Sequence, residues 1–191
     1  SVGGNNAIVD WVLLELRSAA SPSVVLDTRS ALIQRDGDIV DVDGVSPVNM
    51  RSAAGNYHVA VRHRNHLGVM TASPVTLTAS GPLVDFTAPA TGTYGTQAQK
   101  TSGGAFSKQV MWGGDVGFDH VIKYTGANND RDPILVNIGG TTPNNTVTSY
   151  GPNDVNLDGQ VKYTGSANDR DPILVNIGGN TPNNTRLEQL P

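Results

Sequence analysis

Short apolar segments alternate with turn residues along the first 87 positions of the chain. Each segment is rich in Val, Leu and Ile, and Gly, Pro and Asp residues separate one segment from the next. The seven segments lie at 8–17, 23–27, 31–35, 39–43, 57–64, 75–79 and 83–87. In the fifth segment, Tyr57, Val59 and Val61 alternate with His58 and Arg62, as in a strand with one buried face. The spacing predicts a mainly β fold, with an Ig-like or prealbumin-like β-sandwich over residues 1–87.

The first segment differs from the others because both of its faces are apolar. On a strand, Val12, Leu14 and Leu16 lie on one face, and Trp11 and Leu13 lie on the opposite face. We therefore expect this strand to be covered on both sides, either by its own domain or by a neighbouring molecule.

Residues 88–109 follow the predicted sandwich and carry little apolar periodicity. Gly, Ser, Thr and Ala dominate this stretch. The composition predicts a linker or an extended arm that crosses the surface.

An internal repeat occupies the rest of the chain. Residues 115–146 align without gaps on residues 154–185, at an offset of 39 residues, and 24 of the 32 positions are identical. Identity at this level indicates a duplicated structural unit. The repeat predicts a second module over residues 110–191, built from two copies of one fold.

The second copy opens with the residue pattern of a calcium loop. Asp154, Asn156 and Asp158 supply oxygen atoms at loop positions 1, 3 and 5, and Gly159 permits the sharp turn at position 6. The backbone carbonyl of Gln160 is the expected ligand at position 7. Alternate side chains of a tight coil converge on one point, where calcium takes about six to eight oxygen ligands.

Two carboxylates are candidates for closing this loop. A standard loop closes with an acidic residue at position 12, but that position is Gly165 here. Asp169 and Asp171 are the next carboxylates, and they precede an apolar stretch, 172–177, that predicts a short helix. Either Asp169 closes the loop and Asp171 caps the helix, or the two residues have the reverse roles.

The first copy keeps part of the same pattern. Asp115 and Asp119 remain, whereas Gly117 stands at the Asn position and His120 at the turn glycine. Water can fill a vacant ligand position, so we expect calcium here too, with solvated Asp-rich turns as the alternative for both copies. The remaining candidate ligands of this copy are Val121, through its carbonyl, Asp130 and Asp132.

The Asp-x-Asn-x-Asp-Gly opening and its duplication resemble the dockerin-like calcium modules of secreted bacterial proteins. The resemblance covers residues 110–186 and implies a loop-helix fold with calcium as the cofactor, although the Tyr-Thr-Gly insertion departs from the dockerin pattern. Segments 29–44 and 55–70 resemble a β-rich module near the C-termini of large surface and secreted proteins of Bacteroidota-type bacteria. That module often precedes the Lys-Tyr-Thr-Gly repeat, which implies an extracellular or cell-surface protein without a catalytic role.

Composition excludes several classes of protein. The net charge of −4 argues against a nucleic-acid binder, and the longest apolar run, 12–14, is far too short to span a membrane. Without cysteine, the chain has no disulfides and no thiol chemistry. Fifteen of the seventeen acidic residues are Asp, which suits turns and calcium loops better than helix surfaces.

Two further clusters contain candidate metal ligands. His58, His63 and His66 lie close together in sequence, but adjacent arginines repel a cation, so a polar strand end or a packed interface is favoured over a zinc site. The acidic residues within 36–43 fit either a third calcium site or a hairpin with an Asp-Gly turn. The chain has no Gly-x-Ser-x-Gly or His-Glu-x-x-His motif, so we do not expect an enzyme.

The favoured function is a self-assembling structural subunit that forms a filament, tube or sheath with copies of itself. The two modules make up nearly this whole sequence, whereas in the similar proteins they are appendages of larger chains. Segment 1–6 or the 88–107 arm is expected to pair with a sheet edge of a neighbour. The alternative is a calcium-stabilised accessory or adhesion module for a glycan or a protein, with Trp112 and Tyr124 as the candidate sugar platform.

Overall fold

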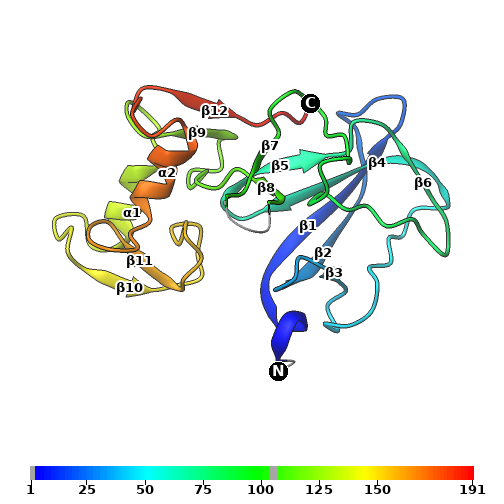
Figure 1. Ribbon diagram of the computed structural model, residues 1–191, viewed down its shortest axis with the longest axis horizontal. Coiled ribbons are helices and arrows are strands. Elements are labelled where there is room, and N and C mark those ends of the chain that lie inside the picture. The colour runs from blue at the N-terminus through cyan, green and yellow to red at the C-terminus, as the bar shows by residue number, and fades with distance from the viewer. Residues whose placement is uncertain (1–2, 104–106) are drawn as a thin grey trace. The chain divides into compact units, whose positions relative to one another are not determined.

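A computed structural model describes residues 3–103 and 107–191 of the chain (Figure 1). The described chain is mainly β, with antiparallel sheets and two short helices, as the sequence predicts. The chain divides into two compact units. The first contains the described parts of Ser1–His63, Gly68–Val110 and Gln189–Pro191, and the second contains Arg64–Leu67 and Met111–Glu188.

The first unit is built on a six-stranded sheet with the strand order β3-β2-β1-β4-β5, in which β6 also pairs with β4. Aliphatic residues of β1 lie opposite aliphatic residues of its neighbours: Val12 faces Ala31 in β2, and Leu16 faces Val59 in β4. Such cross-strand pairs stabilise the sheet, and Val12, Leu16 and Ala31 are buried. The strand bounds are β1 (Ile8–Ser18), β2 (Val25–Gln34), β3 (Ile39–Val40), β4 (Gly55–His63), β5 (His66–Met70) and β6 (Val75–Leu77).

The strands differ from the predicted set in three places. The segments 23–27 and 31–35 belong to one strand, β2, because the polar residues between them continue the ladder, with Ser30 opposite Leu13. Strand β5 was not predicted as a separate strand, and segment 83–87 contains no strand. A β-sandwich fits this unit only coarsely, since its described strands form one six-stranded sheet and one two-stranded sheet.

The two faces of β1 are covered unequally. On the Val12 face the sheet is buried, as expected, but Trp11 on the other face is 47% exposed. Farther along the same face, Glu15 and Arg17 are buried and hydrogen-bond to each other. The expectation of cover on both sides therefore holds for only part of the strand.

The described residues of 88–110, which span the expected linker or arm, belong to the first unit. Backbone hydrogen bonds bind this stretch to the rest of the unit, from Tyr94 N to Met70 O and from Gln109 N to Thr87 O. A two-stranded sheet forms between β7 (Gln99–Thr101) and β8 (Gln109–Met111). The predicted arm 88–107 also includes residues 104–106, which lie outside the described chain.

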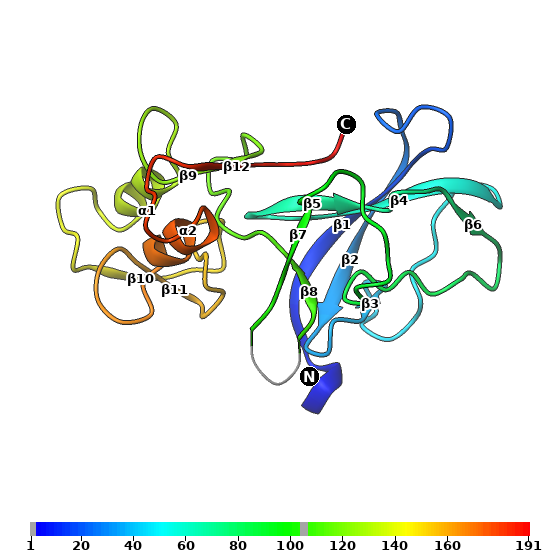
Figure 2. The same cartoon turned by 45° about the horizontal axis from the view of Figure 1, so that its top comes forward.

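The second unit contains the two repeats, and each repeat supplies a strand, a helix and a second strand. The elements of the first repeat are β9 (Val121–Lys123), α1 (Arg131–Asn137) and β10 (Thr146–Thr148), and those of the second are β11 (Gln160–Lys162), α2 (Arg170–Asn176) and β12 (Thr185–Leu187). Strand β10 pairs with β11, and β12 pairs with β9, so that the last strand of each repeat joins the other repeat (Figure 2).

Equivalent aliphatic residues of both repeats form the core of this unit. Because the apolar residues of each helix recur with the helical period, α1 and α2 each bury one stripe of aliphatic side chains and expose Val136 or Val175. Leu67, at the start of β5, completes the core cluster. The other buried members are Val116, Ile122, Ile134, Ile138, Val155, Val161, Ile173 and Ile177.

Candidate metal centres

The loop of the second repeat coils around the carboxylate of Asp154. Leu157 and Gly159 adopt left-handed backbone conformations, with φ of +63° and +79°. This coil points two backbone N–H groups inward: Asp158 N donates to Asp154 Oδ1 and Gly159 N donates to Asp154 Oδ2, each at 3.1 Å. The predicted tight turn at Asp158-Gly159 is therefore present, and Asp154 lies fully buried at its centre.

Asp169 extends its carboxylate into the same loop from the other side. It precedes the first residue of α2, but its side chain makes no cap hydrogen bond to the helix. Instead, Asp169 Oδ1 accepts from Val155 N at 2.7 Å and from Asn156 N at 3.2 Å, and Oδ2 accepts from Lys162 N at 2.8 Å. The carboxylate thus ties the start of the loop to strand β11, and it is fully buried.

Asp171 has a different role, in the first turn of α2. Asp171 N donates to Asn168 Oδ1 at 2.9 Å, and Asn168 Nδ2 donates to Asp171 Oδ2 at 2.8 Å. This reciprocal pair resembles a capping box, with the Asn168 side chain in the place of both the capping group and the returning donor. Sequence reasoning missed Asn168, although the Asn-x-x-Asp spacing is a signal for such a box. Of the two candidate closing residues, the one whose carboxylate reaches the loop is Asp169.

The other predicted ligands of this loop lie at its outer side. Asn156 Oδ1 accepts from Asp158 N at 2.9 Å, and Asp158 Oδ1 accepts from Gln160 N at 2.9 Å. The side chains of Asp158 and Gln160 are exposed. These hydrogen bonds stabilise the coil and leave further lone pairs on the carboxylate and amide oxygens.

The first repeat reproduces this geometry with its own residues. Asp119 N and His120 N donate to the two carboxylate oxygens of Asp115, each at 3.2 Å. Asp130 Oδ1 accepts from Val116 N at 2.7 Å, in the place of Asp169. His120 adopts the left-handed conformation of the missing glycine, with φ of +66°. The remaining candidates are Asp132, in the capping box of α1 with Asn129, and Val121, whose N–H donates to Asp119 Oδ1.

Each loop therefore holds a pair of buried carboxylates, and burial raises the pKa of all four. In the first repeat, burial raises the pKa of Asp130 to about 7, and the nearby charge of Asp115 adds to this shift. In the second, burial raises the pKa of Asp169, and the charge of Asp154 acts in the same direction. A negative charge out of water is costly unless a cation or hydrogen-bond donors compensate it.

The second loop has a protein cation beside it. Arg64 Nη2 lies 3.6 Å from Asp154 Oδ2, and both side chains are buried. The charge of Arg64 lowers the pKa of Asp154, against the larger, raising effect of burial. Its neighbour Asn65 donates from Nδ2 to the backbone oxygen of Asp154 at 2.8 Å. The Arg64-Asn65 turn thus holds the start of the loop in place.

Within residues 3–103 and 107–191, no three Asp, Glu or His side chains gather in a group that would hold a metal ion. Each loop brings two carboxylates inside, whereas Asp119 and Asp158 turn toward their own backbone. A cation in either loop would therefore need carbonyl, amide or water oxygens for the rest of its coordination. Calcium accepts all of these ligands.

The other predicted metal clusters have separate partners for their members. Among the histidines, His58 Nδ1 lies 2.9 Å from Thr71 O, His63 Nε2 lies 3.1 Å from Asp10 Oδ2, and His66 Nδ1 lies 2.8 Å from Asn65 Oδ1. Within 36–43, Asp41 accepts from Arg29, and Asp43 accepts from the backbone of residues 45 and 46. These contacts fit the packed interface and the hairpin that the sequence also allowed.

The aromatic rings of the second unit are stacked against arginines. Trp112 is half-buried, and the guanidinium carbon of Arg186 lies 3.9 Å from the ring centroid. Tyr124 is half-buried beneath Arg131 at 5.2 Å. Each ring therefore presents little free face to a sugar.

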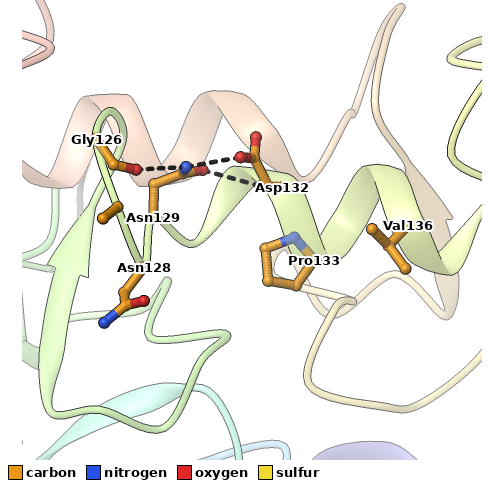
Figure 3. A pocket seen from close by; sticks show the side chains of 7 residues that line it. Gly126, Asn128, Asn129, Asp132, Pro133 and Val136 are labelled. Carbon is orange, nitrogen blue, oxygen red and sulfur yellow. Dashed lines mark hydrogen bonds between the residues drawn. The ribbon is translucent and has the colours of Figure 1, made fainter.

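An open depression of about 470 Å³ lies beside the start of α1 (Figure 3). Gly126, Asn129 and Asp132 line it together with Pro133 and Val136. Asn129 Nδ2 donates to Gly126 O and to Asp132 Oδ2, each at 2.8 Å, so the polar groups at its rim are engaged in capping the helix. The depression offers a small apolar surface and no arrangement of a nucleophile with a base.

No protein-family model matches the chain, and no curated protein or solved structure matches it either. Among the described helices, none is long and apolar enough to cross a membrane. The assignment of a function therefore rests on the chemistry of the two loops and on the surfaces of the two units.

Substitution of Gly159 by Ala is expected to destabilise the second unit more than the matched substitution of Gly165. Both glycines have φ near +80°, at +79° and +86°, which costs a non-glycine residue about 1 kcal/mol. At Gly159 the new methyl group would also lie 3.3 Å from Cζ of Tyr150, whereas at Gly165 it meets no atom within 4 Å. Because the Tyr150 ring is 73% exposed and can move by a few tenths of an ångström, we expect a loss of about 1–2 kcal/mol for Gly159→Ala, measured by denaturant unfolding. Equal losses for the two variants would contradict the tight fit against Tyr150.

Proposed function

We propose that the chain is a non-catalytic, calcium-stabilised structural subunit outside the cell, which assembles with copies of itself into a filament, tube or sheath. In this proposal the second unit is a dockerin-like pair of calcium loops, and the first is an Ig-like sandwich that forms the body of the subunit. The carboxylate pairs support the calcium, and one open sheet edge supports the assembly.

The calcium part follows from the charge inside the loops. Asp154 and Asp169 have no measurable exposure, and Asp115 and Asp130 are 3% and 1% exposed. Two carboxylates in one small coil repel each other and lose their hydration, which a hard cation with oxygen ligands would offset. Arg64 offsets part of this charge in the second repeat. The loops therefore favour a divalent cation, and their oxygen-only ligands favour calcium over zinc or copper.

The open edge of β2 is the observation that carries the assembly part. On its outer side β2 pairs only with β3, through Leu32 and Ile33, so Val25–Ala31 has no strand partner there within the described chain. Leu26 is 53% exposed, next to the exposed Val24 and Val25. Natural proteins usually protect such an edge with Lys, Pro or a covering loop. The exposed apolar end of this edge, at residues 24–26, is suited to pairing with another chain.

The charged residues of this edge do not protect it, because they are engaged within the unit. Asp27 Oδ2 accepts from Arg51 N at 2.6 Å and from Ser52 N at 2.8 Å. Arg29 pairs with Asp41 at 2.7 Å. The predicted donor segment 1–6 includes residues 1 and 2, which lie outside the described chain. Its residue Asn5 already accepts a backbone hydrogen bond from Asp36, so this segment is held in its own unit.

The alternative function is an accessory or adhesion module, and the exposed Trp11 is the observation that favours it. Trp11 is paired with Leu32 on the neighbouring strand β2. An exposed indole is a common contact for sugars and for protein partners. The assembly hypothesis uses a different surface, the open edge of β2 near Leu26. A polymerisation assay therefore separates the two functions.

Sedimentation with calcium, and then with excess chelator, tests the proposed function. We expect the protein to pellet as a polymer with calcium and to release 20.0 kDa subunits with the chelator. The variant Leu26→Lys places a charge at the open edge and is expected to reduce the pelleted fraction at least tenfold. Val45→Lys, at a 72% exposed loop position of the same unit, is the matched control and should assemble normally.

A monomer under both conditions would contradict self-assembly, and glycan screening with a Trp11→Ala control would then test the adhesion module. Polymer that survives the chelator would retain the structural role and contradict the dependence on calcium. Equal assembly of the two lysine variants would exclude the β2 edge as the contact.

A further inference from the structure

The two repeats exchange their last strands within one chain. Strand β10 belongs to the first repeat but pairs with β11 of the second, and β12 belongs to the second but pairs with β9 of the first. The equivalent strands have the same register, with Thr146 opposite Lys162 and Thr185 opposite Lys123. Each repeat therefore has an acceptor strand that is completed by a donor strand from a different repeat.

The turns before the donor strands take part in the same exchange. Thr164 Oγ1 donates to Pro143 O and to Asn144 Oδ1, each at 2.9 Å. At the equivalent place, Thr125 Oγ1 donates to Pro182 O at 3.0 Å and to Asn183 Oδ1 at 2.8 Å. The contacts of donor and acceptor are thus duplicated in side chains as well as in backbone register.

We propose that β12 also completes β9 of a second copy of the chain, so that successive copies are linked by exchanged strands. This inference rests on the proposed self-assembly and names one of its contacts. The donor segment is residues 180–188, and its partner is the acceptor strand β9 with Thr125. Glu188 and then Gln189–Pro191 follow β12. Gln189–Pro191 belong to the first unit, where Arg17 Nη1 donates to Pro191 O at 3.1 Å, and this contact has to open before β12 can leave its own chain.

The exchange conserves the contacts between β12 and β9 that the closed chain makes. Acceptor β9 meets the same donor residues whether they come from its own chain or from another copy, so the enthalpy of the interface is unchanged. The cost is the loss of intramolecular closure, which corresponds to an effective concentration of about millimolar for a short linker. Assembly at high local concentration, or during folding, therefore favours the exchanged form.

The connection between α2 and β12 is the hinge. It contains Gly178 and Gly179, with φ of +123° and +71°, followed by Pro182. Glycines can take up the new backbone angles, while the proline stiffens the segment just before the donor strand. The corresponding hinge after α1 has the same residues except for Thr141 in place of Asn180.

The exchange also explains how a polymer would grow. Pairing of two identical β2 edges is two-fold symmetric, so it joins copies in twos and needs a second, different contact to give the proposed filament. The β12-to-β9 contact uses two different surfaces, so each copy receives one donor strand and gives one away. Such a contact continues from copy to copy and produces an open chain of subunits.

Paired cysteines test this proposal, because the natural chain contains none. The double variant Lys123→Cys with Thr185→Cys places one thiol on β9 and one on β12, at directly opposed positions. Opposed residues of antiparallel strands lie about 4.5–5.5 Å apart between Cα atoms, which suits a disulfide. The matched control is Thr146→Cys with Lys162→Cys, the equivalent pair between β10 and β11, which stays within one chain in both forms.

Both variants are refolded with calcium, allowed to assemble, oxidised and dissolved in detergent without reductant. We expect a ladder of cross-linked multimers for the β9–β12 pair and monomers for the control pair. Co-refolding of the single variants Lys123→Cys and Thr185→Cys should also give cross-linked dimers, in excess of those from either variant alone. Oxidation of the dilute, closed β9–β12 monomer before assembly should abolish polymer formation, and reduction should restore it.

The outcomes separate this inference from the proposed function. If both double variants form polymer but release only monomers after oxidation and dissolution in detergent, the strand exchange is overturned and self-assembly is retained. Cross-linked dimers without any sedimenting polymer would support the exchange and overturn the filament. The absence of both polymer and inter-chain disulfides would overturn the two proposals together.

Discussion

Saturating calcium is expected to raise the midpoint of thermal unfolding of the second unit by roughly 16–32 °C above that of the chelated protein. An ion present at about 1,000 times its dissociation constant stabilises the state that binds it by about 4 kcal/mol. Each kcal/mol shifts the midpoint of a domain of 60–100 residues by about 4–8 °C. The physical source is the relief of charge repulsion and desolvation within each buried carboxylate pair.

The two tryptophans allow this transition to be observed separately in each unit. Trp11 lies on β1 of the first unit, and Trp112 packs against the core of the second. In a Trp11→Phe variant, fluorescence reports the second unit alone, and a Trp112→Phe variant reports the first. Calcium should raise the unfolding midpoint of the second unit, seen in Trp11→Phe, strongly. The midpoint of the first unit, seen in Trp112→Phe, should change by at most a few degrees. Magnesium, which requires a smaller octahedral site, is the control ion and should give a much weaker shift. The absence of any calcium shift would contradict calcium loops in both repeats.

The sequence was most informative where the fold is built from contacts that are local in the chain. The duplicated 32-residue unit, its turn at Asp158-Gly159 and its short helix are all set by residues within one repeat. The turn can be predicted because Gly159 favours the left-handed conformation. The same reasoning missed that His120 adopts this conformation too, since two donated backbone hydrogen bonds to Asp115 hold the coil in place.

The features that the sequence did not reveal depend on contacts between distant residues. Thr28-Arg29-Ser30 looks like a break between two strands, yet pairing with β1 keeps it extended. The exposure of Trp11 depends on which segments cover each face of the sheet. The pairing of β12 with β9 joins residues that lie more than 60 positions apart, and each of these strands has only three residues. Such short strands have no recognisable alternation, so no local pattern marks them.

Substitution of Asp169 by Ala is expected to abolish calcium binding at the second loop and to destabilise the second unit by at least about 3 kcal/mol. The variant removes the acceptor for the N–H groups of Val155, Asn156 and Lys162. A buried donor left without a partner costs about 1–3 kcal/mol. Removal of a carboxylate with a raised pKa offsets part of this cost in the chelated protein, so the loss should be larger with calcium present.

Asp171→Ala is the matched control, because it removes a carboxylate two residues away that serves only the helix cap. Loss of the capping box with Asn168 should cost about 1 kcal/mol and leave calcium binding unchanged. Calorimetric titration should therefore count one site fewer for Asp169→Ala than for Asp171→Ala. The reverse result would assign loop closure to Asp171 and require its side chain to leave the cap. Each variant loses one carboxylate at the start of α2. A difference in calcium binding between them therefore reports which carboxylate is needed and not how many are lost.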